Sequence, residues 1–308
     1  MSRKSEHIRT DIYARITDRI VADLEKGVRP WVRPWRAENL TGRVSRPLRH
    51  NGQPYTGLNV LLLWSESVAS GFKSATWMTL RQANELGAHV RKGESGATVV
   101  YASRFTRTER DASGGEIERD VPFLKAYTVF NCDQIEALPE HYYRRPEPVA
   151  KPLERIEHAD RFLDNTGAVV RYGGDKAYYS PSTDHIQLPR PELFRDMASM
   201  VAIRSHETLH WTSAPGRLNR DLSRYHKDRR ERAFEEMVAE LGSAMICADL
   251  GIVPELDPRP DHAAYIQSWA AILGSDKRAI FAAAAHAQRA VNYLHALQPN
   301  AETSREAA

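Results

Sequence analysis

The stretch His206-Glu207-Thr208-Leu209-His210 matches the HExxH pattern, which zinc hydrolases place on a helix. Two imidazoles four residues apart share one helix face, so both can reach one metal ion while the glutamate lies beside the remaining coordination position. The pattern therefore predicts a metal site, with Glu207 as the general base for a water that attacks a carbonyl carbon. Because HExxH also arises by chance on surface helices, the flanking sequence has to support this prediction.

The flanking sequence predicts two helices around the motif. Apolar residues at helical spacing precede it from residue 191 onward, and Pro191 suits a first helical position, which places both histidines in the last turns. Residues 230–249 repeat this apolar spacing until Gly251 ends the pattern, and they carry an acidic face. The second helix can therefore supply a carboxylate to the metal.

A catalytic zinc takes three protein ligands and leaves one position open, which makes a glutamate of the second helix the expected third ligand. Glu236 is favoured, with Glu240 one turn later accepting a hydrogen bond from a ligating histidine. Glu235 remains a rival, since the preference rests only on the glutamate four residues after Glu236. Zinc suits this ligand set best, and manganese or cobalt are expected substitutes.

Two further segments are expected near the metal. Residues 177–188 are predicted to form two short strands around a Ser-Pro-Ser-Thr-Asp turn, and such a strand could pair with an extended peptide or merely cover a core. Residues 261–297 are predicted to be helical, with Tyr265 as a candidate oxyanion donor and His286 as a substitute ligand or oxyanion contact. For both side chains, packing in the core is the competing interpretation.

Other segments carry a family resemblance. In the second half they are His206 to Arg220, Glu235 to Gly242, Ala248 to Gly251, Tyr265 to Trp269 and Asp276 to Ile280. In the first half they are Trp31 to Trp35, Asn51 to Tyr55, Gly57 to Asn59, Trp77 to Thr79, Gln82-Ala83 and Val90 to Glu94. In this order they resemble the ArdC-type antirestriction proteins of conjugative plasmids, and the first-half segments are similar to a domain shared with TraC-type plasmid primases.

The resemblance implies an α+β fold in which an N-terminal single-stranded DNA-binding domain precedes a mainly helical, zincin-like metallopeptidase domain with a small sheet. It also implies a role in protecting incoming plasmid DNA from host restriction during conjugation. A host protein is the implied class of peptidase substrate, but a metal site by itself does not establish proteolysis.

The first half of the chain is strongly basic. Residues 1–105 contain 17 lysines and arginines and 9 acidic residues, a net charge of +8, whereas the whole chain carries +3. Aromatic and cationic residues alternate in this region, which suits single-stranded DNA because its phosphates and its unstacked bases are both exposed. The competing interpretation is that the aromatic residues fill a core. The expected DNA-binding residues are Trp35, Arg36, Tyr55, Arg91 and Lys92.

Local patterns also predict the elements of the first half. Helices are expected up to Leu24, over 59–67 and over 79–86, strands over 97–105 and 125–131, and a mobile hairpin loop over 107–120. The proline-rich stretch 138–152 is the expected linker. The predicted domains are residues 1–145 and 146–299, followed by a disordered tail over 300–308.

Composition limits the classes of protein to which the chain can belong. The 308 residues are 42% hydrophobic and 27% charged, as in ordinary soluble proteins. Cys132 and Cys247 are isolated, and neither a secretory signal nor a long apolar span is present, so a cytoplasmic location is expected. The sequence contains no GxxxxGK[ST] pattern, which argues against an ATP-driven motor.

Three functions remain open at this stage. The first is a DNA-binding antirestriction protein with a zinc-dependent peptidase domain. The second is a DNA-coating protein whose metal is structural, and the third is a cytosolic metallopeptidase whose basic domain recognises protein. Glu207 separates them, because a structural metal has no use for a general base.

Overall fold

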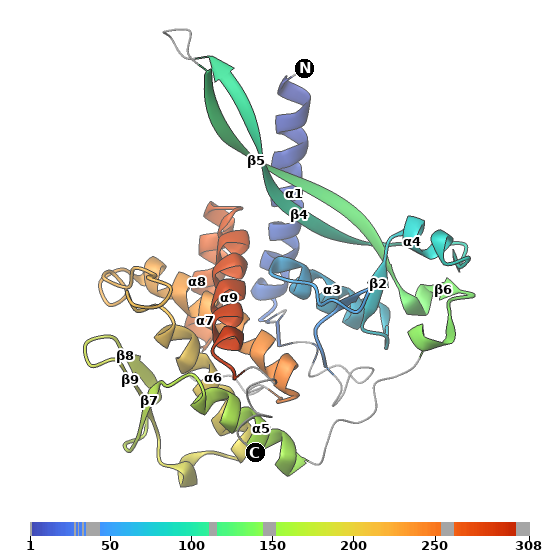
Figure 1. Cartoon of the computed structure of the whole chain (residues 1–308). Helices are drawn as coiled ribbons and strands as arrows, with labels where there is room; N and C mark the ends of the chain where they lie inside the picture. The colour runs from blue at the N-terminus through green and yellow to red at the C-terminus, as the bar shows by residue number, and fades with distance from the viewer. Residues whose placement is uncertain are drawn as a thin grey trace.

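The computed structural model of the chain describes residues 2–27, 29, 31–32, 34, 44–110, 116–143, 152–253 and 262–299. Figure 1 shows the long N-terminal helix α1 beside the C-terminal helices, with the long β-ribbon crossing it in this view. Mixed helices and small sheets make the fold α+β, as predicted. No helix within the described ranges has both the length and the apolar character that crossing a bilayer requires.

Three helices of the first half follow the local sequence signals. They are α1 (Ser2–Glu25), α3 (Leu58–Ser70) and α4 (Leu80–Glu85). Helix α3 ends at Gly71, whose φ of 71° is the left-handed conformation that favours glycine. Thr79 caps α4 through a capping box with Gln82. The three predicted helices are therefore confirmed.

A long β-ribbon dominates the first half. Strands β1 (Leu48–Arg49), β2 (Thr76–Met78), β5 (Glu116–Asn131) and β4 (Ala97–Arg110) form one sheet in the order β1-β2-β5-β4. Strands β3 (His89–Val90) and β6 (Ile135–Glu136) form a separate pair. The predicted loop over 107–120 was wrong, because β4 and β5 stay paired as far as Arg110 and Glu116. Backbone hydrogen bonds alone can extend a two-stranded ribbon, so polar composition does not end it.

In the second half, the described residues combine a three-stranded sheet with five α-helices. Strands β7 (Val169–Tyr172), β9 (His185–Leu188) and β8 (Tyr178–Ser180) lie in the order β7-β9-β8, with β8 at the edge. The helices are α5 (Pro152–Asp164), α6 (Met197–Trp211), α7 (Arg229–Leu250), α8 (His262–Ser275) and α9 (Ala279–Ala296). The predicted strands around the Ser-Pro-Ser-Thr-Asp turn are confirmed.

Helix α6 begins later than predicted. Pro191 starts a short 3-10 helix that ends at Leu193, and α6 starts at Met197. Asp196 sets this start, because its side chain accepts a hydrogen bond from the backbone N–H of Ser199 at 2.7 Å. Both histidines of HExxH nevertheless lie in the last turns of α6, as expected.

Buried residues from both halves of the chain form one hydrophobic cluster. Trp31 and Trp269 are fully buried and pack edge to face, with ring centroids 5.2 Å apart. Arg46 of the first half also pairs with Asp249 of the second half at 2.6 Å. The predicted domain boundary near residue 145 and the tail over 300–308 lie outside the described residues, so both stay predictions.

Candidate metal centre

Helices α6 and α7 pack closely enough to bring their functional side chains together. A Cβ atom placed on Gly242 of α7 would lie 2.5 Å from Cδ1 of Leu209 on α6. Leu209 is fully buried, so its side chain has little room to move away. The missing side chain at Gly242 therefore permits the close contact between the helix that carries HExxH and the helix that carries the glutamates.

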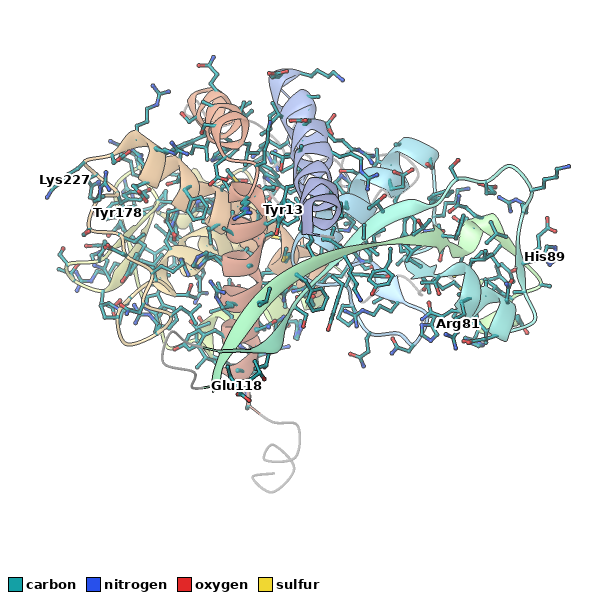
Figure 2. All side chains as sticks on the ribbon, turned by 90° about the horizontal axis from the view of Figure 1, so that it is seen from above. Tyr13, Arg81, His89, Glu118, Tyr178 and Lys227 are labelled. Atoms are coloured by element: carbon teal, nitrogen blue, oxygen red, sulfur yellow. The ribbon has the colours of Figure 1, made fainter. Side chains whose placement is uncertain are left out.

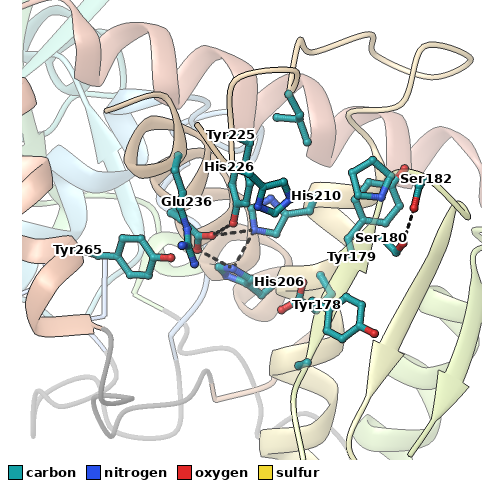
Figure 3. A pocket seen from close by; sticks show the side chains of 15 residues that line it. Tyr178, Tyr179, Ser180, Ser182, His206, His210, Tyr225, His226, Glu236 and Tyr265 are labelled. Atoms are coloured by element: carbon teal, nitrogen blue, oxygen red, sulfur yellow. Dashed lines mark hydrogen bonds and ion pairs between the residues drawn. The ribbon is translucent and has the colours of Figure 1, made fainter. Parts of the chain in front are cut away.

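His206, His210 and Glu236 converge on one point, shown in Figure 3. The two Nε2 atoms are 3.2 Å apart, and Nε2 of His206 and His210 lie 3.4 and 3.7 Å from the Glu236 carboxylate. Zinc bonds of about 2.0–2.1 Å in a tetrahedral arrangement separate neighbouring ligand atoms by about 3.3 Å. The spacing and the chemistry of these donors therefore fit a divalent metal ion.

Glu235 lies behind this cluster, on the other side of His210. Its carboxylate is 3.2 Å from Nδ1 of His210, and Arg220 donates two hydrogen bonds to it at 2.7 and 3.0 Å. A proton on Nδ1 of His210 directed at Glu235 leaves the Nε2 lone pair facing the cluster, as metal binding requires. Glu235 thus positions His210, whereas Glu236 lies with His206 and His210 as the third candidate ligand.

Glu240 has the corresponding place beside His206. One carboxylate oxygen lies 3.9 Å from Nδ1 of His206, beyond hydrogen-bond distance. The other oxygen accepts hydrogen bonds from the Trp31 indole at 3.3 Å and from Arg29 at 3.5 Å. Two residues of the N-terminal half therefore contact a carboxylate next to the candidate metal ligand His206.

The charges of Glu235 and Glu236 favour a positive charge at the two histidines. Burial disfavours the charged form of His210, but Glu235 and Glu236 outweigh it and raise the pKa of His210 to about 10. Burial acts against ionisation of Glu236 as well, yet hydrogen bonds from both histidines hold its pKa well below the usual range. A bound divalent cation would supply the same compensation as the proton on His210.

The cluster opens into a cavity of 580 Å³. Glu207 lines it although only 4% of the residue is exposed, and the edge strand β8 forms part of its wall. Figure 3 shows Tyr178, Tyr179 and Ser180 of this strand beside the two histidines. The expected general base and an unpaired sheet edge therefore share one cavity.

Tyr265 lines the cavity from α8 and stacks on Trp269 at 5.9 Å. Its hydroxyl points toward the side of the cluster where Glu236 lies (Figure 3). Arg232 lies over the rings of Tyr265 and Tyr225, with its Cζ atom 5.6 and 5.5 Å from their centroids. His286 does not line the cavity; its Nδ1 is 2.8 Å from Arg289.

Sequence reasoning missed Tyr225, whose hydroxyl donates a hydrogen bond to Glu236. It assigned no role at the metal centre to Arg220, Arg232, Arg29 or Trp31 either. The segment between the two helices has many charges and no apolar period, so nothing in it distinguishes one polar residue from the next. These residues reach the cluster through chain geometry that local patterns do not contain.

The expected DNA-binding residues are not brought together as one group. Trp35 and Arg36 lie outside the described residues. Tyr55 is 8% exposed and lines a different cavity, with Arg49 over its ring. Arg91 and Lys92 follow β3 at the surface and do not line that cavity, and Arg91 pairs with Glu94 at 2.6 Å.

Comparison with known families follows the two halves of this fold. Residues 10–130 match the family model of the N-terminal domain of anti-restriction factor ArdC, and residues 157–286 match that of a zincin-like metallopeptidase. The chain belongs to the ArdC family of antirestriction proteins. The two family models confirm the predicted order of an ArdC-type N-terminal domain followed by a zincin-like metallopeptidase domain.

Solved structures of an ArdC protein share the fold. The metal-free crystal structure of antirestriction ArdC from the R388 plasmid is 43% identical, with a TM-score of 0.77 over 93% of this chain and 97% of that one. The Mn(II)-bound structure is 42% identical, with a TM-score of 0.75 over 94% and 99%. A divalent metal therefore binds a close structural relative in the ArdC family.

Two curated relatives extend the family. Protein y4eC of Sinorhizobium fredii (strain NBRC 101917 / NGR234) is 42% identical over 299 residues, which cover 95% of this chain and 94% of that protein. DNA primase TraC of Escherichia coli is 34% identical over 307 residues, which cover 94% of this chain but 28% of the primase. The similarity to TraC thus reaches beyond the N-terminal half predicted from the sequence.

Proposed function

We propose that this ArdC-family chain binds single-stranded DNA, carries a zinc-dependent peptidase site, and protects incoming plasmid DNA during conjugation. The observation that carries the peptidase part is the convergence of His206, His210 and Glu236 at one end of a cavity that Glu207 also lines. The family match supports the antirestriction part.

His206, His210 and Glu236 would hold the zinc ion, which when bound acts as a Lewis acid on a substrate carbonyl. Glu207 follows His206 on the same helix and can accept a proton from a water in the cavity. Tyr265 can donate a hydrogen bond to the oxygen on which negative charge develops. Glu235 and Arg220 support His210, so the histidine keeps one orientation during the reaction.

The edge strand β8 can bind the substrate. Among the described strands it pairs only with β9, and Tyr178, Tyr179 and Ser180 line the cavity. An extended peptide can add to such an edge through backbone hydrogen bonds, which do not depend on its side chains. A host protein with an accessible extended segment is therefore the proposed class of substrate.

The proposed DNA-binding function rests on the charge of the first half. The excess of lysine and arginine over residues 1–105 attracts phosphates, and the exposed tyrosines of the ribbon offer rings for base stacking. Phosphate attraction and base stacking do not depend on sequence, because every nucleotide has a phosphate and a base with a π-face. We therefore expect binding without sequence preference.

Comparing Glu207→Gln with the unaltered protein tests the peptidase site. We expect both proteins to retain zinc by mass spectrometry of the metal, because Glu207 is not one of the ligands. Cleavage of a mixture of unfolded proteins, read as new peptides, should fall at least about 100-fold in the variant. If zinc-loaded protein produces no new peptides with or without oligothymidylate, the site is structural and the DNA-coating alternative holds.

The same variant tests whether the peptidase site serves antirestriction. We expect Glu207→Gln to lower plasmid transfer into a restricting recipient and to leave transfer into a non-restricting recipient unchanged. Full protection by the variant would separate the peptidase site from antirestriction.

A further inference from the structure

A second cavity, of 680 Å³, lies between the β4–β5 ribbon and helix α9. Its walls come from the ribbon, residues 49–51, the start of α3 and two residues of α9; it is hereafter the ribbon groove. Figure 2 shows the ribbon from above, running from the end of the molecule that carries His89 and Arg81 to Glu118. The volume lies in the range of about 300–1,000 Å³ that ligand sites occupy.

Exposed aromatic rings line the ribbon groove. Tyr101 and Tyr127 are 53% and 46% exposed although both border the cavity. Tyr127 is opposite Val99 and Tyr101 is opposite Lys125, so all four lie on the same face of the ribbon. Phe123 extends this face, with its ring 6.1 Å from that of Tyr101. The ribbon therefore carries two exposed tyrosine rings and the partly exposed ring of Phe123 on one face.

The ribbon groove also has the charge that a polyanion needs. None of the described residues that line it is acidic. Arg49 lines the groove and lies 5.5 Å from the Tyr55 ring centroid. Lys125 lies beside the groove, opposite Tyr101 on the ribbon, with its Nζ 5.3 Å from the Phe123 ring centroid. Within the described part of the chain, neither cation pairs with a carboxylate, whereas Arg91 pairs with Glu94. The charges of Arg49 and Lys125 are therefore available to a ligand.

We propose that the ribbon groove is a binding site for single-stranded DNA, in which successive bases stack on Tyr101 and Tyr127 while Arg49 and Lys125 contact the flanking phosphates. The proposal rests on the proposed DNA-binding function and locates it partly on Tyr101, Tyr127 and Lys125, which the sequence did not single out. Duplex DNA hides its base faces, so the stacking contacts select the single strand.

Fluorescence anisotropy of labelled oligothymidylate with the full-length protein tests this site. We expect Tyr101→Ala and Tyr127→Ala each to weaken binding at least about fivefold, because each removes a stacking surface. Tyr101→Phe and Tyr127→Phe should bind like the unaltered protein. Tyr172→Ala is the matched control, since Tyr172 is 48% exposed on β7 and lies outside the groove.

The phosphate contacts have a separate readout. Arg49→Gln and Lys125→Gln should each reduce the slope of log Kd against log salt concentration by about 0.7, the value for one lost contact to a single strand. A duplex probe should bind more weakly and should not respond to the tyrosine substitutions.

The outcomes distinguish the two proposals. If the unaltered protein binds no oligothymidylate, the DNA-binding function and the groove assignment both fail. If it binds and the alanine variants bind equally well, only the groove assignment is overturned. Loss of binding in the phenylalanine variants to the same extent as in the alanine variants would overturn stacking as the mode of binding.

Discussion

Glu235 and Glu236 are adjacent in sequence and differ in what they contact. Glu236 lies within 3.4 and 3.7 Å of the two histidine Nε2 atoms, whereas Glu235 lies between His210 and Arg220. Successive residues of a helix point about 100° apart. Glu236 therefore faces the two Nε2 atoms, and Glu235 faces Arg220 and the Nδ1 atom of His210. Removal of the two carboxylates should therefore have different effects on stability and on zinc binding.

We expect Glu235→Ala to lower the free energy of unfolding by about 3–5 kcal/mol, because it leaves Arg220 buried without its carboxylate. Glu236→Ala should instead abolish the rise in melting temperature that zinc produces, since only this change removes a ligand. Differential scanning fluorimetry with zinc and with a chelator measures both effects. A zinc-dependent shift that survives in Glu236→Ala and is lost in Glu235→Ala would reverse the assignment.

At the scale of elements, the metal centre depends on the crossing of α6 and α7. The Asp196 cap determines where α6 begins, and Gly242 permits the contact with Leu209. Glycine inside a helix is unfavourable by about 1 kcal/mol relative to alanine. Close packing of the two helices offsets this cost at Gly242, which explains a residue that helical propensity alone would disfavour.

We expect Gly242→Ala to destabilise the protein by about 1–3 kcal/mol and to weaken zinc binding, because the added methyl group forces the two helices apart. Gly274→Ala is the matched control, since nothing lies within 4 Å of a Cβ atom there. That substitution should be neutral or stabilising by up to about 1 kcal/mol. Chemical denaturation measures the free energy of unfolding of both variants. Equal stability would contradict a close contact between α6 and α7 at Gly242.

The whole molecule connects its N-terminal half to the metal centre through two tryptophans. Trp31 donates its indole N–H to Glu240, beside His206, while Trp269 donates its own to the backbone oxygen of Ala233 at 2.7 Å. The two rings pack against each other within the shared cluster. The basic half and the metallopeptidase-like half are therefore packed together at this junction.

We expect Trp31→Phe to lower zinc affinity by up to about 10-fold, because Glu240 loses the indole donor that fixes its carboxylate beside His206. Trp269→Phe provides the comparison, as it removes a similar buried ring and a hydrogen bond that does not reach the cluster. Both variants should lower the melting temperature. Competition with a zinc-sensitive dye measures the affinities, and equal affinities would show that the junction is structural alone.

The sequence by itself determined α1, α3, α4 and α7, the HExxH motif, the acidic face of α7 and the basic character of the first half, because helical spacing and charge are local properties of the chain. It also favoured Glu236 over Glu235 as the third candidate ligand, by the spacing to Glu240, and Glu236 lies with both histidines in the structure. Only the tertiary structure decided that Glu235 supports His210, that Trp31 and Arg29 contact Glu240, and that Tyr101 and Tyr127 border one groove. These contacts join residues from different elements, and their distances depend on how helices cross and how far a ribbon stays paired, which no local pattern contains.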